Sequence, residues 1–244
     1  MRRLLPDPGE TTIAEQLEGY RPWEQPQEER PLVAMNFVTT VDGRAALDGR
    51  TKALGSEADT EMLQRLRTRF DGILVGAGTV RAERYGRMVS DPQLRARRER
   101  AGLPHDPLAV IVSGRLDLPW DASIFTDGGG RVLIFTASEA EPPETATPVR
   151  VVRHEGFVDP LEMMRYLRRE RGIRALLCEG GPGLHGELQA AGLVDELFLT
   201  IAPLLTGGEE PRILEGELLA PAELELAWLL EEHGELFCRF RRRP

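Results

Sequence analysis

Short apolar runs alternate along most of the chain with longer stretches in which apolar residues recur at helical spacing. Two of the longer stretches, residues 56–70 and 159–171, predict helices. Each begins with a capping residue, Ser56 or Asp159, and continues with an apolar stripe that we expect in the core. Strands that alternate with helices favour an α/β fold with a mostly parallel sheet covered on both faces. The predicted strands are residues 32–38, 72–75, 108–112, 132–135, 149–152 and 175–178.

The C-terminal part departs from this alternation. Residues 195–203, 223–231 and 235–242 predict three strands with only loops between them. We therefore expect antiparallel strands at the edge of the parallel core, and hence a mixed sheet. No linker or shift in composition divides the chain. The expected organisation is a polar, proline-rich N-terminal arm at residues 1–30 and a single domain at residues 31–244.

The composition and charge of the chain argue against a nucleic acid or a membrane as its partner. Fractions of 41% hydrophobic and 29% charged residues are ordinary for a globular protein, and the net charge of −9 disfavours a nucleic-acid partner. No apolar run approaches the roughly 20 residues of a membrane span, and the N-terminus lacks the pattern of a signal peptide. We therefore expect a cytoplasmic protein without a membrane partner. A local run of arginines is interpreted as a solvent-exposed face: Arg95, Arg97, Arg98 and Arg100.

Neither cysteine suggests a disulfide or a metal site. Cys178 and Cys238 each lie inside an apolar strand pattern, which predicts buried thiols. The chain also lacks H-x-E followed by P-C-x-x-C, the signature of zinc-dependent deaminases. We predict no metal.

Two glycine-bearing turns follow buried strands. The turn E-G-G-P-G at residues 179–183 precedes a short helix, so its backbone N–H groups could bind a phosphate; a plain turn is the alternative. The turn G-A-G-T-V at residues 76–80 repeats the arrangement. It is not a G-x-G-x-x-G fingerprint, because Arg81 stands where the third glycine would, and no Gly-Lys-Ser/Thr follows. Ser113 and Arg115, after the third predicted strand, suit a phosphate on a ribose.

The first predicted strand ends in polar residues. Asn36, Thr40 and Asp42 occupy alternating positions, so their side chains are expected to share one face near the carboxyl end of the strand. Ligands of open α/β sheets bind outside such strand ends. For Asp42, a simple turn with Gly43 is the alternative.

These motifs carry a family resemblance when they are read in order. They are N-x-x-x-T-x-D-G at 36–43, G-x-G-T-V at 76–80, E-G-G-P at 179–182, G-L-V-D-E at 192–196, A-P at 202–203 and G-G at 207–208. Over residues 31–242 the chain resembles the pyrimidine reductase family of riboflavin biosynthesis. That family includes the C-terminal domain of the bifunctional deaminase-reductase and stand-alone reductases. The resemblance implies a dihydrofolate-reductase-like fold and a homodimer.

The resemblance also implies the reaction and the site. NADPH would transfer a hydride to 2,5-diamino-6-ribosylamino-4(3H)-pyrimidinone 5′-phosphate or its deaminated form, opening the ribose to ribitol. The implied cofactor residues are Gly78, Thr79 and Val80, Ser113 and Arg115 at the 2′-phosphate, and Gly180, Gly181, Pro182, Gly183 and Leu184 at the pyrophosphate. Asn36, Thr40, Asp42 and Glu179 would face the substrate. Asp42 and Glu179 are the candidates to supply a proton, with Glu83 third.

One segment departs from the family pattern. Where the family has Asp-Asp-Pro and a downstream Arg, residues 82–87 read A-E-R-Y-G-R. Glu83 is expected to replace the first Asp, and Arg84 or Arg87 to meet the substrate phosphate. This change and the altered segment at residues 53–56 resemble stand-alone actinobacterial relatives. Two alternatives therefore stay open: a reductase of the same fold acting on another substrate such as dihydrofolate, and an NADPH-binding protein without catalysis.

Overall fold

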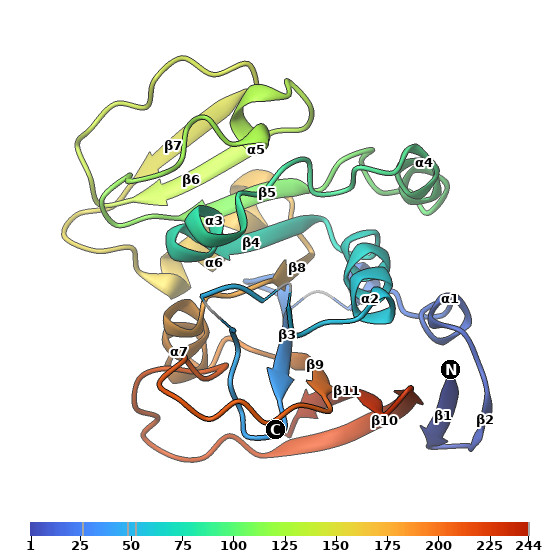
Figure 1. Ribbon diagram of the computed structural model, residues 1–244. Helices are drawn as coiled ribbons and strands as arrows, with labels where there is room; N and C mark the ends of the chain where they lie inside the picture. Colours follow the sequence, from blue (N-terminus) through green and yellow to red (C-terminus); the bar gives the residue numbers. More distant parts are fainter. Residues whose placement is uncertain (26, 48, 52, 244) are drawn as a thin grey trace.

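One mixed sheet runs through the computed structural model, which describes residues 1–25, 27–47, 49–51 and 53–243 (Figure 1). The sheet has eleven strands in the order β2-β1-β10-β11-β9-β3-β8-β4-β5-β6-β7. The strands are β1 (Arg2–Leu5), β2 (Gly9–Glu10), β3 (Leu32–Thr40), β4 (Gly72–Gly76), β5 (Leu108–Val112), β6 (Val132–Thr136), β7 (Val149–Arg153), β8 (Ala175–Cys178), β9 (Glu196–Ala202), β10 (Leu224–Glu232) and β11 (Glu235–Arg242). The helices are α1 (Ile13–Gln16), the 3-10 helix η1 (Pro22–Glu24), α2 (Glu57–Arg67), α3 (Ala77–Glu83), α4 (Pro92–Arg100), α5 (Ser123–Thr126), α6 (Pro160–Arg171) and α7 (Pro182–Ala190).

The parallel part of the sheet extends from β9 to β7. Each neighbouring pair in it is parallel, and β3 lies between β8 and β9 with Met35 opposite both Cys178 and Leu197. The carboxyl ends of β3, β4 and β8 therefore meet at one edge, where both glycine turns begin. The predicted fold class, a mixed and mostly parallel sheet with antiparallel C-terminal strands, is confirmed.

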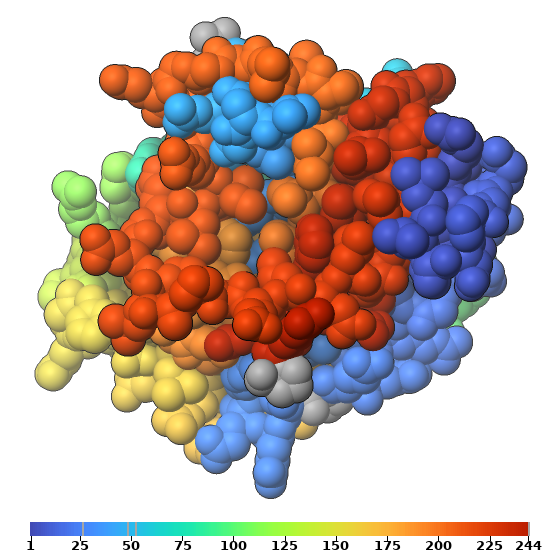
Figure 2. Space-filling view, turned by 90° about the horizontal axis from the view of Figure 1, so that it is seen from below, coloured from blue at the N-terminus to red at the C-terminus, as the bar shows by residue number. Residues whose placement is uncertain are grey.

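The antiparallel part differs in detail from the expectation. β10 and β11 are antiparallel, but β9 pairs parallel with β3 on one side and antiparallel with β11 on the other. Residues 1–30, expected as an N-terminal arm, contribute β1, which pairs with β10, and β2, which pairs with β1. Figure 2 shows these dark blue residues packed beside the red C-terminal strands. Leu17 and Trp23 of the same segment are buried in the core.

The hydrophobic core lies on both faces of the sheet. On one face, Met62 and Leu66 of α2 are buried against it, and on the other Met164 and Leu167 of α6 are buried. α2 and α6 begin as predicted, because Ser56 and Asp159 each accept a hydrogen bond from a backbone N–H of the first turn. Two members of the predicted stripes are not core residues: Leu161 is 40% exposed, and Leu63 lines a pocket.

One arginine of the predicted solvent-exposed run is buried. Arg98 is 0% exposed and donates hydrogen bonds to the backbone carbonyls of Arg67, Phe70 and Pro104. Burial lowers the pKa of its guanidinium to about 10. Arg98 therefore ties α4 to the end of α2, a contact between distant segments that a local charge pattern does not reveal.

Both cysteines are buried, as predicted, and burial raises the pKa of the Cys178 thiol to about 12. Among the described residues, no helix has the length and apolar character needed to cross a membrane.

Candidate active site

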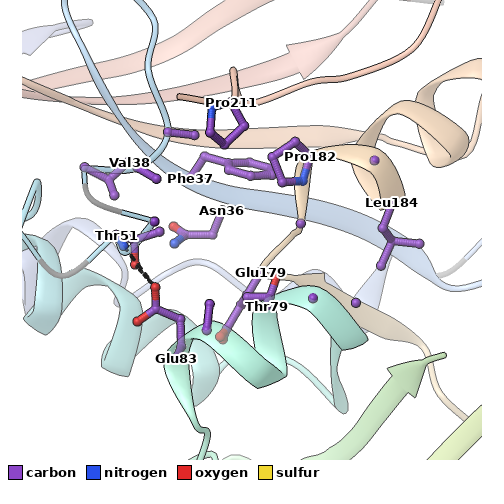
Figure 3. Close-up of a pocket in the computed structure, with 18 of the residues that line it drawn as sticks. Asn36, Phe37, Val38, Thr51, Thr79, Glu83, Glu179, Pro182, Leu184 and Pro211 are labelled. Atoms are coloured by element: carbon purple, nitrogen blue, oxygen red, sulfur yellow. Dashed lines mark hydrogen bonds between the residues drawn. The ribbon is translucent and has the colours of Figure 1, made fainter. Parts of the chain in front are cut away.

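A cavity of about 440 Å³ opens at the carboxyl edge of the sheet, beside β3, the turn after β8, α2 and α3 (Figure 3). The loop after β3 covers it: the Ala45 N–H donates to the Pro211 carbonyl at 2.8 Å, and both residues line the cavity. Nine of the sequence-predicted site residues line it: Asn36, Gly78, Thr79, Glu83, Glu179, Gly181, Pro182, Gly183 and Leu184.

The two glycine turns contact each other at one end of this cavity. The Gly76 N–H donates to the Gly180 carbonyl at 2.8 Å. Gly180 has φ +94°, and a Cβ there would lie 3.2 Å from the Phe37 ring. A Cβ on Gly181 would lie 3.0 Å from the Thr79 hydroxyl oxygen. Glycine at both positions thus permits the close approach of the turns, which the sequence predicted only from shared topology.

The start of α7 presents backbone donors to the same end. Its N-cap is Gly181, so no side chain bonds the first N–H groups of the helix. A helix N-terminus with free N–H groups binds anions, because those groups and the helix dipole both favour negative charge. Gly78, across from α7, has open space where a Cβ would stand. This cradle fits the phosphates of a dinucleotide such as NADPH.

Glu179 is held in a buried ion pair. Arg67 of α2 donates to both of its carboxylate oxygens at 2.6 Å, and the Tyr85 hydroxyl donates to one of them at 2.9 Å. The Arg67 and Glu179 side chains are only 10% and 4% exposed. Burial alone would lower the pKa of Arg67, but the attraction of Glu179 outweighs it and raises that pKa above its usual value. Arg67 and Tyr85 were not singled out from the sequence.

Asp42 and Thr40 lie outside the cavity lining. The Thr40 side chain is 1% exposed, and its hydroxyl donates to Asp42 at 2.6 Å and accepts from the Arg44 N–H at 2.9 Å. Asp42 is exposed and accepts the Thr206 and Gly207 N–H groups at 3.2 and 2.7 Å. In this arrangement Asp42 joins the turn after β3 to the loop after β9.

We expect the replacement Asp42→Asn to affect this junction rather than turnover. The hydrogen bond from Thr40 and those from the Gly207 and Thr206 N–H groups lower the pKa of Asp42 to about 2. Because this folded-state pKa lies below the unfolded value, the stabilisation is present above about pH 4 and is lost as the pH falls toward 2. Urea unfolding of both proteins across this range should show a weaker pH dependence for the variant. Loss of turnover with unchanged unfolding would instead support the catalytic role predicted for Asp42.

Of the predicted substrate residues at the end of α3 and just after it, only Glu83 lines the cavity. Glu83 lines the cavity and accepts hydrogen bonds from the Thr51 N–H and hydroxyl at 2.9 and 3.0 Å, closing one wall (Figure 3). Arg84 is exposed and donates to Asp121 at 2.6 Å, outside the cavity lining. Arg87, the other predicted phosphate ligand, is paired with Asp106.

Four predicted cofactor residues also lie outside the cavity lining: Val80, Ser113, Arg115 and Gly180. Val80 is 0% exposed and belongs to the core under α3, because the helical turn that points Thr79 at the cavity points the next side chain at the sheet. Ser113 is buried and Arg115 exposed, just beyond the carboxyl end of β5. Gly180 is not in the lining, but it directly precedes Gly181, which is.

A carboxylic acid missed as a site residue lines the cavity from α2. Asp59, three residues after the Ser56 cap, was not singled out as a site residue from the sequence, yet its side chain lines the cavity together with Leu63. Burial raises the pKa of Asp59 to about 6. The signal that could have found it is spacing, because positions 59, 63 and 67 are four residues apart and so share one face of a helix.

The fold and the cavity define an open-sheet α/β protein with a ligand site at the carboxyl edge of its parallel strands. The family model described as RibD C-terminal domain matches residues 31–234. The chain therefore belongs to the RibD C-terminal domain family, and the predicted oxidoreductase class is confirmed.

Known proteins support the same family. The 2,5-diamino-6-ribosylamino-4(3H)-pyrimidinone 5′-phosphate reductase of Archaeoglobus fulgidus is 31% identical over 221 residues, covering 87% of this chain and 100% of that protein. The riboflavin biosynthesis protein RibD of Mycobacterium tuberculosis is 35% identical over 180 residues, covering 73% of this chain and 44% of that longer protein. A pyrimidine reductase-like protein of Corynebacterium diphtheriae shares the fold, with a TM-score of 0.75 and 24% identity over 96% of this chain and 100% of that one.

Proposed function

We propose that the chain uses NADPH to reduce 2,5-diamino-6-ribosylamino-4(3H)-pyrimidinone 5′-phosphate or its deaminated form, opening the ribose to ribitol. The observation that carries this proposal is the convergence of two glycine turns and the uncapped start of α7 on one cavity. The glycine turns at one end of the cavity suit the phosphates of a dinucleotide, and Asn36 and Glu83 line the same cavity. The curated name of the relative in A. fulgidus supports the choice of substrate.

The cofactor would lie along the glycine turns. Backbone N–H groups at the start of α7 would bind the pyrophosphate, and Gly78 leaves the space for its close approach. Ser113 and Arg115, beyond β5, would take the 2′-phosphate. When bound, NADPH supplies the hydride, so the task of the chain is to orient both molecules and exclude water.

Glu179 would act on the substrate side as an orienting group. Arg67 donates to both of its oxygens and the Tyr85 hydroxyl to one, so Glu179 would hold Tyr85 at the cavity wall. The catalytic role predicted for Glu179 stays a prediction. Asn36 and Glu83 would contact the substrate directly. Roles for Thr40, Asp42 and Arg84 stay predictions, as do the homodimer and the cytoplasmic location.

An NADPH oxidation assay with purified protein tests the proposal. We expect turnover with at least one of the two ribosylamino-pyrimidine phosphates and none with dihydrofolate. Turnover of dihydrofolate alone would favour a reductase of another substrate. Tight binding of NADPH without oxidation by any of the three compounds would contradict catalysis and favour a binding protein.

A further inference from the structure

The acid Asp59 occupies a part of the cavity that the proposed cofactor does not need. It projects from the first turn of α2, and Leu63 lies one helical turn further along the same wall. α2 and α7 lie on opposite faces of the sheet, so Asp59 and the uncapped start of α7 flank the cavity from different sides (Figure 1). A ring bound between Asp59 and the glycine turns would therefore present to this carboxyl group the edge that points away from the glycine turns.

The surrounding residues fix where the carboxyl group points. Ser56, not Asp59, caps α2: the Ser56 hydroxyl oxygen accepts the Asp59 N–H at 3.2 Å. The Asp59 side chain then folds back over Gly55, where a Cβ would lie 2.9 Å from its Cγ. The Thr200 hydroxyl on β9 lies near the carboxyl group and favours its ionised form. Thr200 is opposite Val38, which itself lines the cavity.

The charges around Asp59 are acidic. Glu235 on β11 is its near neighbour and is bound by the Ser56 hydroxyl. Glu83 and Glu179 line the same cavity, the latter neutralised by Arg67. Burial opposes ionisation of Asp59 most strongly and Glu235 adds to it, while the Thr200 hydroxyl acts in the opposite direction; the pKa of about 6 is the net result. A ligand that donates hydrogen bonds to both carboxylate oxygens would stabilise the ionised form of Asp59, which burial disfavours.

The chemistry of the two candidate substrates differs at one edge. The diaminopyrimidinone ring presents two adjacent N–H donors there, from its 2-amino group and from the neighbouring ring nitrogen. The deaminated, uracil-type ring presents a carbonyl oxygen in place of the amino group. A carboxylate accepts two parallel N–H donors and offers nothing to a carbonyl.

We infer that Asp59 binds the 2-amino edge of the pyrimidinone ring and thereby selects the 2-amino substrate over its deaminated form. The inference rests on the proposed function, and it names which of the two substrates this cavity takes. Asp59 would be a substrate-binding residue at the opposite side of the ring from the reacting ribosylamine.

The replacement Asp59→Asn tests the inference, because an amide offers one donor and one acceptor and so matches the uracil-type edge. The measurement is kcat/KM for both substrates at about pH 8, where a carboxyl group with a pKa of about 6 is ionised. We expect the wild type to prefer the 2-amino substrate and the variant to shift the ratio by about 10- to 100-fold toward the deaminated one. Glu57→Gln, an exposed position two residues earlier and outside the cavity lining, is the matched control and should leave the ratio unchanged.

The ratio separates a binding role from a structural one, because a loss of folded protein lowers both values equally. An equal fall with both substrates, or a wild type without preference for the 2-amino form, would overturn the inference while leaving the proposed function standing. A wild type that reduces neither compound would overturn the proposed function itself. If the variant does not fold, the wild-type ratio still tests the inference: it should decline as the pH falls through about 6, where Asp59 gains a proton. The substrate phosphate titrates in both compounds and cancels in the ratio.

Discussion

Replacing Arg67 by methionine is expected to lower the free energy of unfolding by about 3–5 kcal/mol, because it leaves the buried Glu179 carboxylate without its cation. The guanidinium makes two hydrogen bonds to that carboxylate and a third to the Met88 carbonyl at 3.0 Å, and all three would be lost. Turnover should fall as well, since Arg67 would no longer fix the position of the Glu179 carboxylate that accepts from Tyr85 at the cavity wall.

Urea denaturation measures the first effect. The control is Arg65→Met, two residues earlier on α2, whose partner Glu61 is 48% exposed; its cost should stay within about 1 kcal/mol. Adding Glu179→Gln to the Arg67 variant removes the unpaired charge and should recover part of the loss. A cost below about 1 kcal/mol for Arg67→Met would show that the ion pair does not stabilise the cavity wall.

The second large effect is expected at Gly78, where valine should weaken NADPH binding by about 100-fold or more, or ~2.7 kcal/mol. A Cβ at this position meets nothing within 4 Å in the protein itself, so the new side chain fits the fold. It would instead fill space that the backbone needs to leave for the cofactor.

Calorimetric titration with NADPH gives the affinity, and thermal unfolding of the protein alone should show little change. Gly19→Val is the matched control, because Gly19 also has open space around it and lies outside the cavity lining. Unchanged affinity in the Gly78 variant would contradict the placement of the cofactor along the glycine turns.

Local sequence patterns predicted the elements of this fold well. β5, β8 and β11 have the predicted bounds, and α2 and α6 begin at their predicted caps. Apolar alternation and capping are properties of neighbouring residues, so they can be read without knowing the rest of the fold. β1 escaped notice because it is short and its pairing partner, β10, lies more than 200 positions away along the chain.

The sequence predicted the part of the candidate site that is formed by the glycine turns. It missed the residues whose side chains reach the site from other elements. The turns at Gly76 and Gly181 are visible in sequence because glycine is required for their geometry. Arg67 and Tyr85 carry no such local mark, since their role depends on meeting Glu179 from other elements. Asp42, predicted at the site from alternation along β3, lies outside the cavity lining, because β3 ends at Thr40 and Asp42 accepts the Thr206 N–H beyond it. Its role stays a prediction.

Because β1 pairs with β10, a truncated form of this protein that is to keep the whole sheet must include the N-terminal strands. The family match begins at residue 31, which suggests an expression boundary there. A chain cut at that point would lose the strand that covers β10, together with Leu17, Tyr20 and Trp23 from the core. The exposed strand edge would then be free to recruit other chains into intermolecular sheets. The folded unit is thus larger than residues 31–234, the segment that the family model matches.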